Sequence, residues 1–467
     1  AALDANTTGN HNVAAGTSSL GANTSGDQNT AVGSNSLLSN TTGDRNVGIG
    51  YQSLDANTTG SNSVAVGYAA MGDNTTGGNN VAVGVNALQS NQTGNDNVAV
   101  GRQALEQNTA SNNTACGRLA LFQNTTGTSN VAVGHQALDA NTTASHNTAV
   151  GISTLSTNTT GTRNTAIGSQ ALFANTTADD NTALGHTALD ANTTGTQNTA
   201  VGSSALGANT TGNNSTAVGY QALTANTASN STAVGRRALY ANSSGGNNSA
   251  VGQNALANNA TGSSNTAVGK SALELNTTGA SNTAVGSLAL DANTTSNNST
   301  AVGYAALSNS TAANNTAVGY GSLVATTTGA QNTAVGANAL DANTTGQNNA
   351  AFGMNSLGSN TTASKNTGFG HRTLAENTTG DGNTAVGADA LDANTTATNN
   401  TAVGYVALTE NTTGTKNTAV GAGAADANTT GNNNTALGYG ALSANTTAGD
   451  NTAVGHKAMD FNKIGRA

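Results

Sequence analysis

The chain has 467 residues, of which 59 are Gly and none is Pro or Trp, and only 7% are charged. The formal net charge is −9 at pH 7, from 22 acidic and 13 basic residues that are scattered singly. A composition this poor in aromatic and charged residues disfavours an ordinary globular enzyme, and the lack of a basic stripe disfavours nucleic-acid binding.

A short sequence repeat runs through the whole chain. The Gly that ends a motif similar to Asn-Thr-Ala-Val-Gly occurs 27 times from Gly16 to Gly455, at a constant period of seventeen except for three spacings that are shorter by one. Two of the short repeats lose their residue at 108–112 and 226–230, which indicates an outer turn because a slip within a strand would exchange its two faces. We therefore expect one continuous repeat domain over 1–467, with a divergent last coil at 456–467.

Each repeat is predicted to open with a short strand. In Val64-Ala65-Val66 the first and third positions hold the same apolar residue, which is the period of two typical of a strand. Thr or Val then shares a face with the later Val, and the small Ala on the other face is expected to allow close approach of another backbone or another chain. Cys116, which replaces Val at the third position, is expected to be a buried and inert thiol.

The remainder of the repeat is predicted to contain a second short strand and two turns. Ala137-Leu138 represents the second strand, with Leu as the largest core side chain, and Asn-Thr-Thr-Gly supplies the turn chemistry. A unit of this length is too short for a pair of helices. The sequence therefore predicts an all-β, parallel β-solenoid of about 27 coils, in which each repeat is one coil.

Self-association is also expected from this design. The few medium-sized apolar side chains in each coil do not offset the entropy that is lost when the whole coil is ordered. Stacking must therefore place nearly every backbone group in a ladder, and a further apolar surface must be buried. We therefore expect self-association, and a parallel homotrimeric fibre is the expected state. The number three does not follow from this balance of energies.

Two families resemble this chain over essentially its whole length. Asn-Ser-Val-Ala-Val-Gly at 62–67 resembles the NSVAIG motif of trimeric autotransporter adhesin heads, which form left-handed parallel β-rolls with a shorter repeat. Ala217 to Gln221 and the residues from Ala222 onward resemble the shafts of phage tail fibres. The resemblance implies an extracellular segment, on a cell or virion surface, that takes part in attachment.

The column just after the repeat Gly is the candidate recognition surface. It contains seven of the eight Tyr together with Arg, Lys and His, so it is expected to face solvent. Aromatic and basic groups could bind sugars or anionic polymers, while a tolerant exposed column is the simpler alternative. The candidate residues are Tyr51, Tyr68, Arg102, Arg118, His135, Tyr220, Tyr304, Tyr320, Tyr405 and Tyr439.

Metal and cofactor sites are not expected. His135 and His186 lie three coils apart, so they cannot share an ion within one chain. Asp residues follow the core Leu or its equivalent without occupying successive coils, which repulsion between stacked carboxylates explains, and no calcium-roll signature is present. The Asp residues at this position are Asp4, Asp55, Asp139, Asp190, Asp291, Asp341, Asp392, Asp426 and Asp460.

The Asn-Thr-Thr turns allow two interpretations. Each is formally an N-glycosylation acceptor, but ladders of Asn and Thr that cap the turns are the preferred interpretation. The Asn residues concerned include Asn57, Asn141, Asn192, Asn293 and Asn394. Thr columns such as Thr58, Thr142, Thr193 and Thr294 also suggest the alternative function, an ice-binding β-solenoid.

No catalytic motif is found in the sequence, so no enzymatic activity is expected. No run of apolar residues is long enough for a membrane-spanning helix. The chain begins inside a repeat and without Met, so we expect it to be part of a longer or processed chain. The predicted function is that of an extracellular fibre shaft or adhesin segment that binds itself and a surface glycan or receptor.

Overall fold

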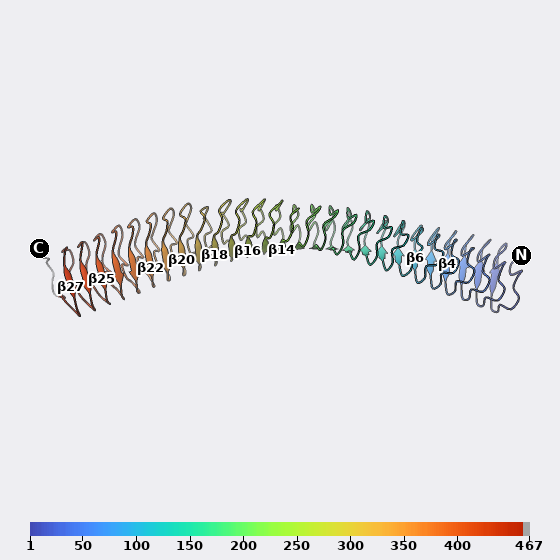
Figure 1. Ribbon diagram of the computed structural model, residues 1–467, viewed down its shortest axis with the longest axis horizontal. Coiled ribbons are helices and arrows are strands. Elements are labelled where there is room, and N and C mark those ends of the chain that lie inside the picture. Colours follow the sequence, from blue (N-terminus) through green and yellow to red (C-terminus); the bar gives the residue numbers. More distant parts are fainter. Residues whose placement is uncertain (461–467) are drawn as a thin grey trace. The chain divides into compact units, whose positions relative to one another are not determined.

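The computed structural model describes residues 1–460, so the part of the predicted divergent coil from 461 onward lies outside the described residues. The chain consists of two compact units, residues 1–231 and 232–467. In each unit the backbone winds into coils that carry one strand apiece (Figure 1). The described residues contain strands, turns and bends and no helix. The predicted parallel β-solenoid is confirmed, and its strands recur at the period of the sequence repeat.

The first unit contains 13 strands of three residues each. They are β1 (Val13–Ala15), β2 (Thr30–Val32), β3 (Val47–Ile49), β4 (Val64–Val66), β5 (Val81–Val83), β6 (Val98–Val100), β7 (Thr114–Cys116), β8 (Val131–Val133), β9 (Thr148–Val150), β10 (Thr165–Ile167), β11 (Thr182–Leu184), β12 (Thr199–Val201) and β13 (Thr216–Val218). Consecutive strands pair in parallel and in register, as Ala166 of β10 does with Ala183 of β11.

The second unit contains 14 strands with the same pairing. They are β14 (Thr232–Val234), β15 (Ser249–Val251), β16 (Thr266–Val268), β17 (Thr283–Val285), β18 (Thr300–Val302), β19 (Thr316–Val318), β20 (Thr333–Val335), β21 (Ala350–Phe352), β22 (Thr367–Phe369), β23 (Thr384–Val386), β24 (Thr401–Val403), β25 (Thr418–Val420), β26 (Thr435–Leu437) and β27 (Thr452–Val454).

The core lies inside each coil and is built from small side chains. In the coil that contains β10, Ala166, Ala171 and Leu172 are all 0% exposed. The middle Ala of the strand therefore points inward, while Ile167 at the third position is 39% exposed. Another chain therefore cannot approach Ala, and that part of the expectation is wrong. The narrow coil interior has room for Ala beside Leu but leaves the β-branched residues outside.

The predicted second strand is also wrong. The six residues after the repeat Gly form a continuous run of turns, as at 169–174. Gln170 has φ 60° and Leu172 has φ 52°, which is left-handed backbone that bulky residues seldom adopt. This conformation turns Leu172 inward, and its N–H still donates to Ala188 O of the next coil at 3.0 Å. Burial of Leu and these backbone bonds offset the conformational cost.

The repeat Gly is required where the strand ends. Gly168 has φ 134°, and a Cβ there would collide with the carbonyl oxygen of Gly185 in the next coil. All 27 repeats keep Gly at this position. The Gly of the Asn-Thr-Thr-Gly turn is not required in the same way, because Ala144 and Ala178 take its place in their coils.

Backbone ladders continue outside the strands. Within the β10 coil, Thr165 N–H donates to Asn181 O at 2.8 Å, and Ala174 N–H donates to Asp190 O at 2.8 Å. Gly168 N–H donates in the other direction, to Val150 O at 2.8 Å. Each coil therefore forms backbone hydrogen bonds with both neighbouring coils. This was expected, because each coil has few apolar side chains in its core.

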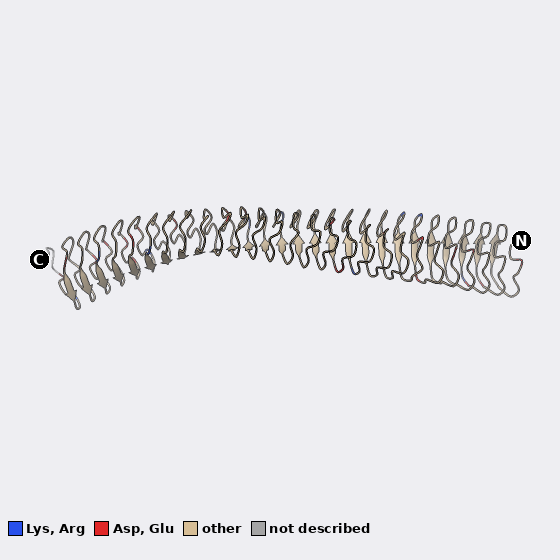
Figure 2. Ribbon diagram, turned by 45° about the horizontal axis from the view of Figure 1, so that its top comes forward, with Lys and Arg blue, Asp and Glu red and all other residues tan. Residues whose placement is uncertain are grey.

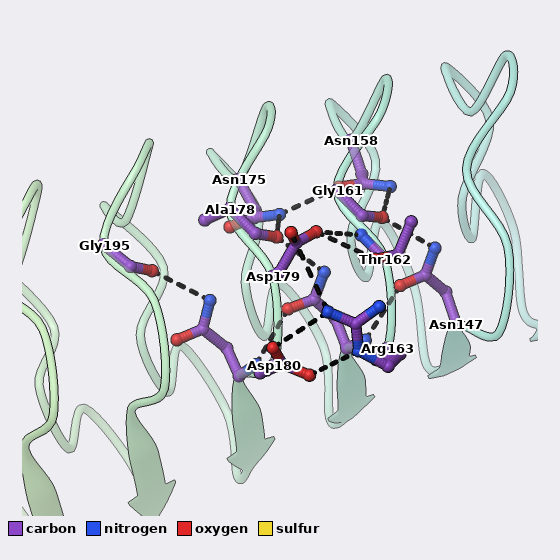
Figure 3. Close-up of polar contacts among 12 residues, drawn as sticks. Asn147, Asn158, Gly161, Thr162, Arg163, Asn175, Ala178, Asp179, Asp180 and Gly195 are labelled. Atoms are coloured by element: carbon purple, nitrogen blue, oxygen red, sulfur yellow. Dashed lines mark hydrogen bonds and ion pairs between the residues drawn. The ribbon is translucent and has the colours of Figure 1, made fainter.

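Buried Asn side chains form two further ladders (Figure 3). Asn175 in the turn is 0% exposed, and its Nδ2 donates to Asn158 Oδ1 at 2.8 Å and to Ala178 O at 3.2 Å. Asn164, just before the strand, donates from Nδ2 to the same Ala178 O at 2.8 Å. The predicted turn ladder of Asn is confirmed, and the second ladder accounts for the Asn that opens the repeat.

Candidate functional site

Three surface columns remain after the core is accounted for: the outer face of the strands, the column after the repeat Gly, and the Asp column. In the described chain, residues 1–460, no group of three His, Cys, Asp or Glu lies close enough to hold a metal ion. A search of the same residues for a helix long and apolar enough to span a membrane gives none.

The outer face of the strands carries no charge. The first and third positions of all 27 strands hold Thr, Val, Ile, Leu, Phe, Ala, Ser or Cys, and the strands in Figure 2 are correspondingly free of charged residues. Many of the third-position side chains are well exposed, as are Val251 at 40% and Val454 at 64%. Phe352 and Phe369 lie with ring centroids 5.5 Å apart on this face. We call it the strand face.

Cys116 lies on the strand face and is exposed. The expectation of a buried thiol is therefore wrong, for the same reason that Val at this position is exposed. The third position of the strand points away from the coil interior, so the residue that replaces Val also points outward.

The column after the repeat Gly lies at the surface. Tyr51, Tyr68, Tyr220, Tyr304, Tyr320, Tyr405 and Tyr439 are between 46% and 61% exposed. Arg102 and Arg118 are exposed and His135 is half-exposed. The structure spreads these predicted residues over both units, so they make several local groups and no single site.

Aromatic side chains of this column stack wherever they occupy successive coils. The rings of Tyr51 and Tyr68 have centroids 5.6 Å apart and planes at 16°, and Tyr304 and Tyr320 match them at 5.6 Å and 14°. Arg118 Nη1 lies 3.3 Å from His135 Nε2 in the next coil. The coil repeat therefore sets a stacking distance for any ring in this column.

Beyond the first turn, where Asn6 is exposed, the Asn of the Asn-Thr-Thr turns named above is not available for modification in the folded chain. Asn57, Asn141, Asn192, Asn293 and Asn394 are all 0% exposed. Their amide nitrogens donate inside the ladder, as Asn192 does to Asn175 Oδ1 at 3.0 Å. A sugar on this nitrogen would require the coil to open.

The hydroxyl of the first Thr is also engaged in most of these turns. Thr193 Oγ1 donates to Thr210 O of the next coil at 3.0 Å, and Thr58 Oγ1 donates to Thr75 O at 3.1 Å. These columns therefore do not present the free hydroxyl rows on which the ice-binding alternative was based.

Ion pairs on the surface join neighbouring coils. Arg163 Nε lies 2.6 Å from Asp180 Oδ1, and Arg163 Nη2 lies 3.0 Å from Asp180 Oδ2, which makes a bidentate pair (Figure 3). This pair lowers the pKa of the Asp180 carboxyl. Because both side chains are exposed, its contribution to stability is small.

The Asp column is half-buried, which the sequence did not reveal. Burial raises the pKa of the carboxyl at seven of its positions, and hydrogen bonds from neighbouring backbone N–H groups oppose the rise at most of them. The seven are Asp55, Asp139, Asp190, Asp291, Asp341, Asp392 and Asp426. Oδ1 of Asp139 and of Asp392 is buried and has no hydrogen-bond partner among the described residues.

We expect Asp341→Asn to raise the free energy of unfolding at neutral pH. Burial raises the pKa of Asp341 above its ordinary value of 3.8, so the folded chain favours the neutral carboxyl. The resulting stabilisation is present below pH 3.8 and is lost as the pH rises through the raised pKa. As the pH rises from 3.8 through the raised pKa, the urea midpoint of unfolding should fall in the parent chain and should fall less steeply in the variant.

Asp180→Asn is the control for the sign of this effect. Arg163 lowers the pKa of Asp180, so its stabilisation is present above the unfolded pKa and is lost as the pH falls. Asp180→Asn should therefore give no gain at neutral pH. An equal gain from both variants would contradict the assignment of the Asp341 effect to burial.

Comparison with known protein families and with curated proteins gave no match in either case.

Proposed function

We propose that the chain is a segment of an extracellular, homotrimeric fibre that presents an attachment surface, as in an adhesin or a tail fibre. The observation that carries the proposal is the strand face, which repeats in every coil without a charged residue. Lys, Arg, Asp and Glu occur freely in the neighbouring columns, so their absence here is confined to one face.

The partner of the strand face is a second copy of the chain. Contiguous exposed apolar surface marks interaction sites, and this surface extends along each unit at the spacing of the coils. Only a partner with the same spacing and the same lack of charge can cover it coil by coil. Another copy in parallel meets both conditions, and the trimer is the state that the resemblance to trimeric adhesin heads implies.

The remaining columns supply the attachment function. The column after the repeat Gly projects away from the strand and holds exposed Tyr, Arg and His side chains. Repetition along a fibre allows weak contacts to add up, because each further contact forms at high effective concentration.

Sedimentation velocity at micromolar concentration tests the association. The parent chain should sediment as an oligomer, and a variant with alternating charges on the strand face should sediment as a monomer. Because Lys and Glu alternate, the new charges do not repel each other between neighbouring coils of one chain. The substitutions should therefore weaken association between chains and not the folding of each chain. The substitutions are Val251→Lys, Val268→Glu, Val285→Lys and Val302→Glu.

The matched control places the same charges on exposed turn residues of adjacent coils and should leave the oligomer intact. Its substitutions are Ser244→Lys, Thr261→Glu, Thr278→Lys and Thr295→Glu. A monomeric parent chain, or a strand-face variant that remains oligomeric, would contradict the proposed interface.

The strand face also supports a second candidate function, ice binding. Thr at the first strand position is partly exposed in many coils, for example at Thr266 and Thr283. Regular rows of Thr and Val at the coil spacing form an uncharged surface that could order water. Thermal hysteresis measured on the strand-face variant and on the parent chain separates the two functions, because only ice binding predicts a hysteresis that the variant loses.

A further inference from the structure

The column after the repeat Gly has a gap at Ala422. Tyr405, Ala422 and Tyr439 occupy this column in three successive coils. The two Tyr side chains are 61% and 57% exposed, and the ring of Tyr439 is stacked on its other side by His456 at 5.3 Å and 14°. Ala422 therefore leaves an empty position between two aromatic rings, one of which is already fixed by a neighbour.

The width of this gap follows from the coil repeat. Rings of adjacent coils in this column stack with centroids 5.6 Å apart, as Tyr304 and Tyr320 do. Tyr405 and Tyr439 are two coils apart, so a six-membered ring placed midway occupies the position that a third ring would have. It then lies at a stacking distance from both faces, within the range of about 4.5–7 Å that ring pairs prefer.

The gap opens into a cleft because the following residue is Gly in two of these coils and has no side chain. Gly423 and Gly440 follow the column residues of their coils and have φ 65° and 58°. Other coils place longer side chains in this left-handed position, such as Asn338 and Arg372. The resulting cleft has a volume of about 310 Å³, which is large enough for one monosaccharide unit.

Polar groups also line the wall of the cleft. Asp426, Lys457 and Asp460 border it, and Lys457 Nζ lies 3.8 Å from Asp460 Oδ2. Ser443 donates its hydroxyl hydrogen bond to Asp460. Burial, with repulsion from Asp460 and Glu410, raises the pKa of Asp426. Two carboxyls against one ammonium make this wall acceptor-rich and unfavourable for an acidic ligand.

We propose that this cleft binds one neutral pyranose ring of a carbohydrate between Tyr405 and Tyr439, with the sugar hydroxyls donating to Asp426 and Asp460. The C–H faces of a pyranose pack on aromatic rings, and its hydroxyls match the carboxyl wall, whereas a flat hydrocarbon would leave that wall unpaired. The inference deepens the proposed attachment function and rests on it for its biological role.

A neighbouring gap in the same column shows why the site is specific to Ala422. Ala388 lies between His371 and Tyr405, but the next position in its coil is Asp389 in place of Gly. Asp389 Oδ1 lies 3.8 Å from His371 Nδ1 and 4.0 Å from Arg372 Nε. Asp389, His371 and Arg372 thus border the gap at Ala388, whereas the residue next to Ala422 is Gly and leaves its cleft open.

Saturation-transfer NMR with methyl glucoside, methyl galactoside and N-acetylglucosamine tests the site on the full chain. At least one of these probes should bind saturably, and Ala422→Tyr, which fills the gap with a third ring, should weaken that binding by about tenfold or more. Ala337→Tyr fills the same column between Tyr320 and Met354 and should leave binding unchanged. Gly423→Asn, a residue that the column accepts elsewhere, should also weaken binding.

Three outcomes would overturn the inference. Absence of saturable binding for all three sugars, or equal weakening by Ala422→Tyr and Ala337→Tyr, would remove the site. Tighter binding of phenol than of any sugar would assign the cleft to aromatic ligands. Because binding is measured regardless of oligomeric state, a monomer that binds sugar would contradict the trimeric fibre alone, and an oligomer that binds none would contradict this cleft alone.

Discussion

Leu273→Asp is expected to open the solenoid at its coil and to lower the free energy of unfolding by about 4 kcal/mol or more. Leu273 is 0% exposed, and loss of a buried Leu side chain alone costs about 2–5 kcal/mol. The introduced carboxylate must in addition lose its hydration inside a coil whose polar groups are already paired. Limited proteolysis followed by mass spectrometry should show new cleavage near this coil.

Leu275→Asp in the same coil is the control. Leu275 is 49% exposed, so the same change of side chain takes place at the surface and should shift the unfolding midpoint only slightly. Equal protease sensitivity in the two variants, or an unchanged Leu273→Asp protein, would contradict the assignment of Leu to the core.

Asn175→Leu is expected to destabilise the chain by about 3 kcal/mol or more, although the two side chains are similar in size. The amide of Asn175 donates to Asn158 and to Ala178 O and accepts from Asn192. Its loss removes three hydrogen bonds, each worth about 0.5–1.5 kcal/mol. Ala178 O and the Asn192 amide keep other partners, but Asn158 Oδ1 loses its donor inside the coil, which costs about 1–3 kcal/mol more. Urea unfolding followed by circular dichroism would measure the change.

Thr177→Ala controls for substitution in the same turn. Thr177 is exposed, so its replacement should change the free energy of unfolding by no more than about 0.5 kcal/mol. If Asn175→Leu were as stable as Thr177→Ala, the amide ladder would not be a source of stability.

The period of the repeat was sufficient to predict the coil, the parallel pairing and the position of the outer turn. A residue deleted in three repeats at the same place, and a Gly kept in all 27, carry that information directly. The ladder of Asn in the turn was predictable as well, because Asn both tolerates turn backbone and hydrogen-bonds to nearby backbone groups.

The orientation of the strand was not predictable in the same way. Alternation in Val64-Ala65-Val66 reveals two faces but does not say which one is inside. Hydrophobicity favours Val, whereas the narrow interior accepts Ala, and the location of Cys116 depends on the same choice. The Ala-Leu pair was expected in a second strand, whereas Leu172 has left-handed backbone. A left-handed Leu is rare, and only tertiary packing explains it.

The candidate cleft depends on residues that are unremarkable one at a time. Ala422, Gly423 and Gly440 are small residues in a sequence rich in them. Their significance emerges only when successive coils are aligned and the neighbouring rings of Tyr405 and Tyr439 are placed beside them. The half-buried state of Asp426 likewise depends on packing between coils.

The short repeats interrupt the ladder of Asn side chains, and we call these interruptions seams. Asn91 Oδ1 is buried and has no hydrogen-bond partner among the described residues, because Asn108 in the next, shortened coil turns its amide to Ala110 O at 2.7 Å. Asn293 Oδ1 lacks a partner where Ser310 takes the place of Asn. Under tension, such a solenoid should yield first at these seams and extend in steps of whole ladder segments.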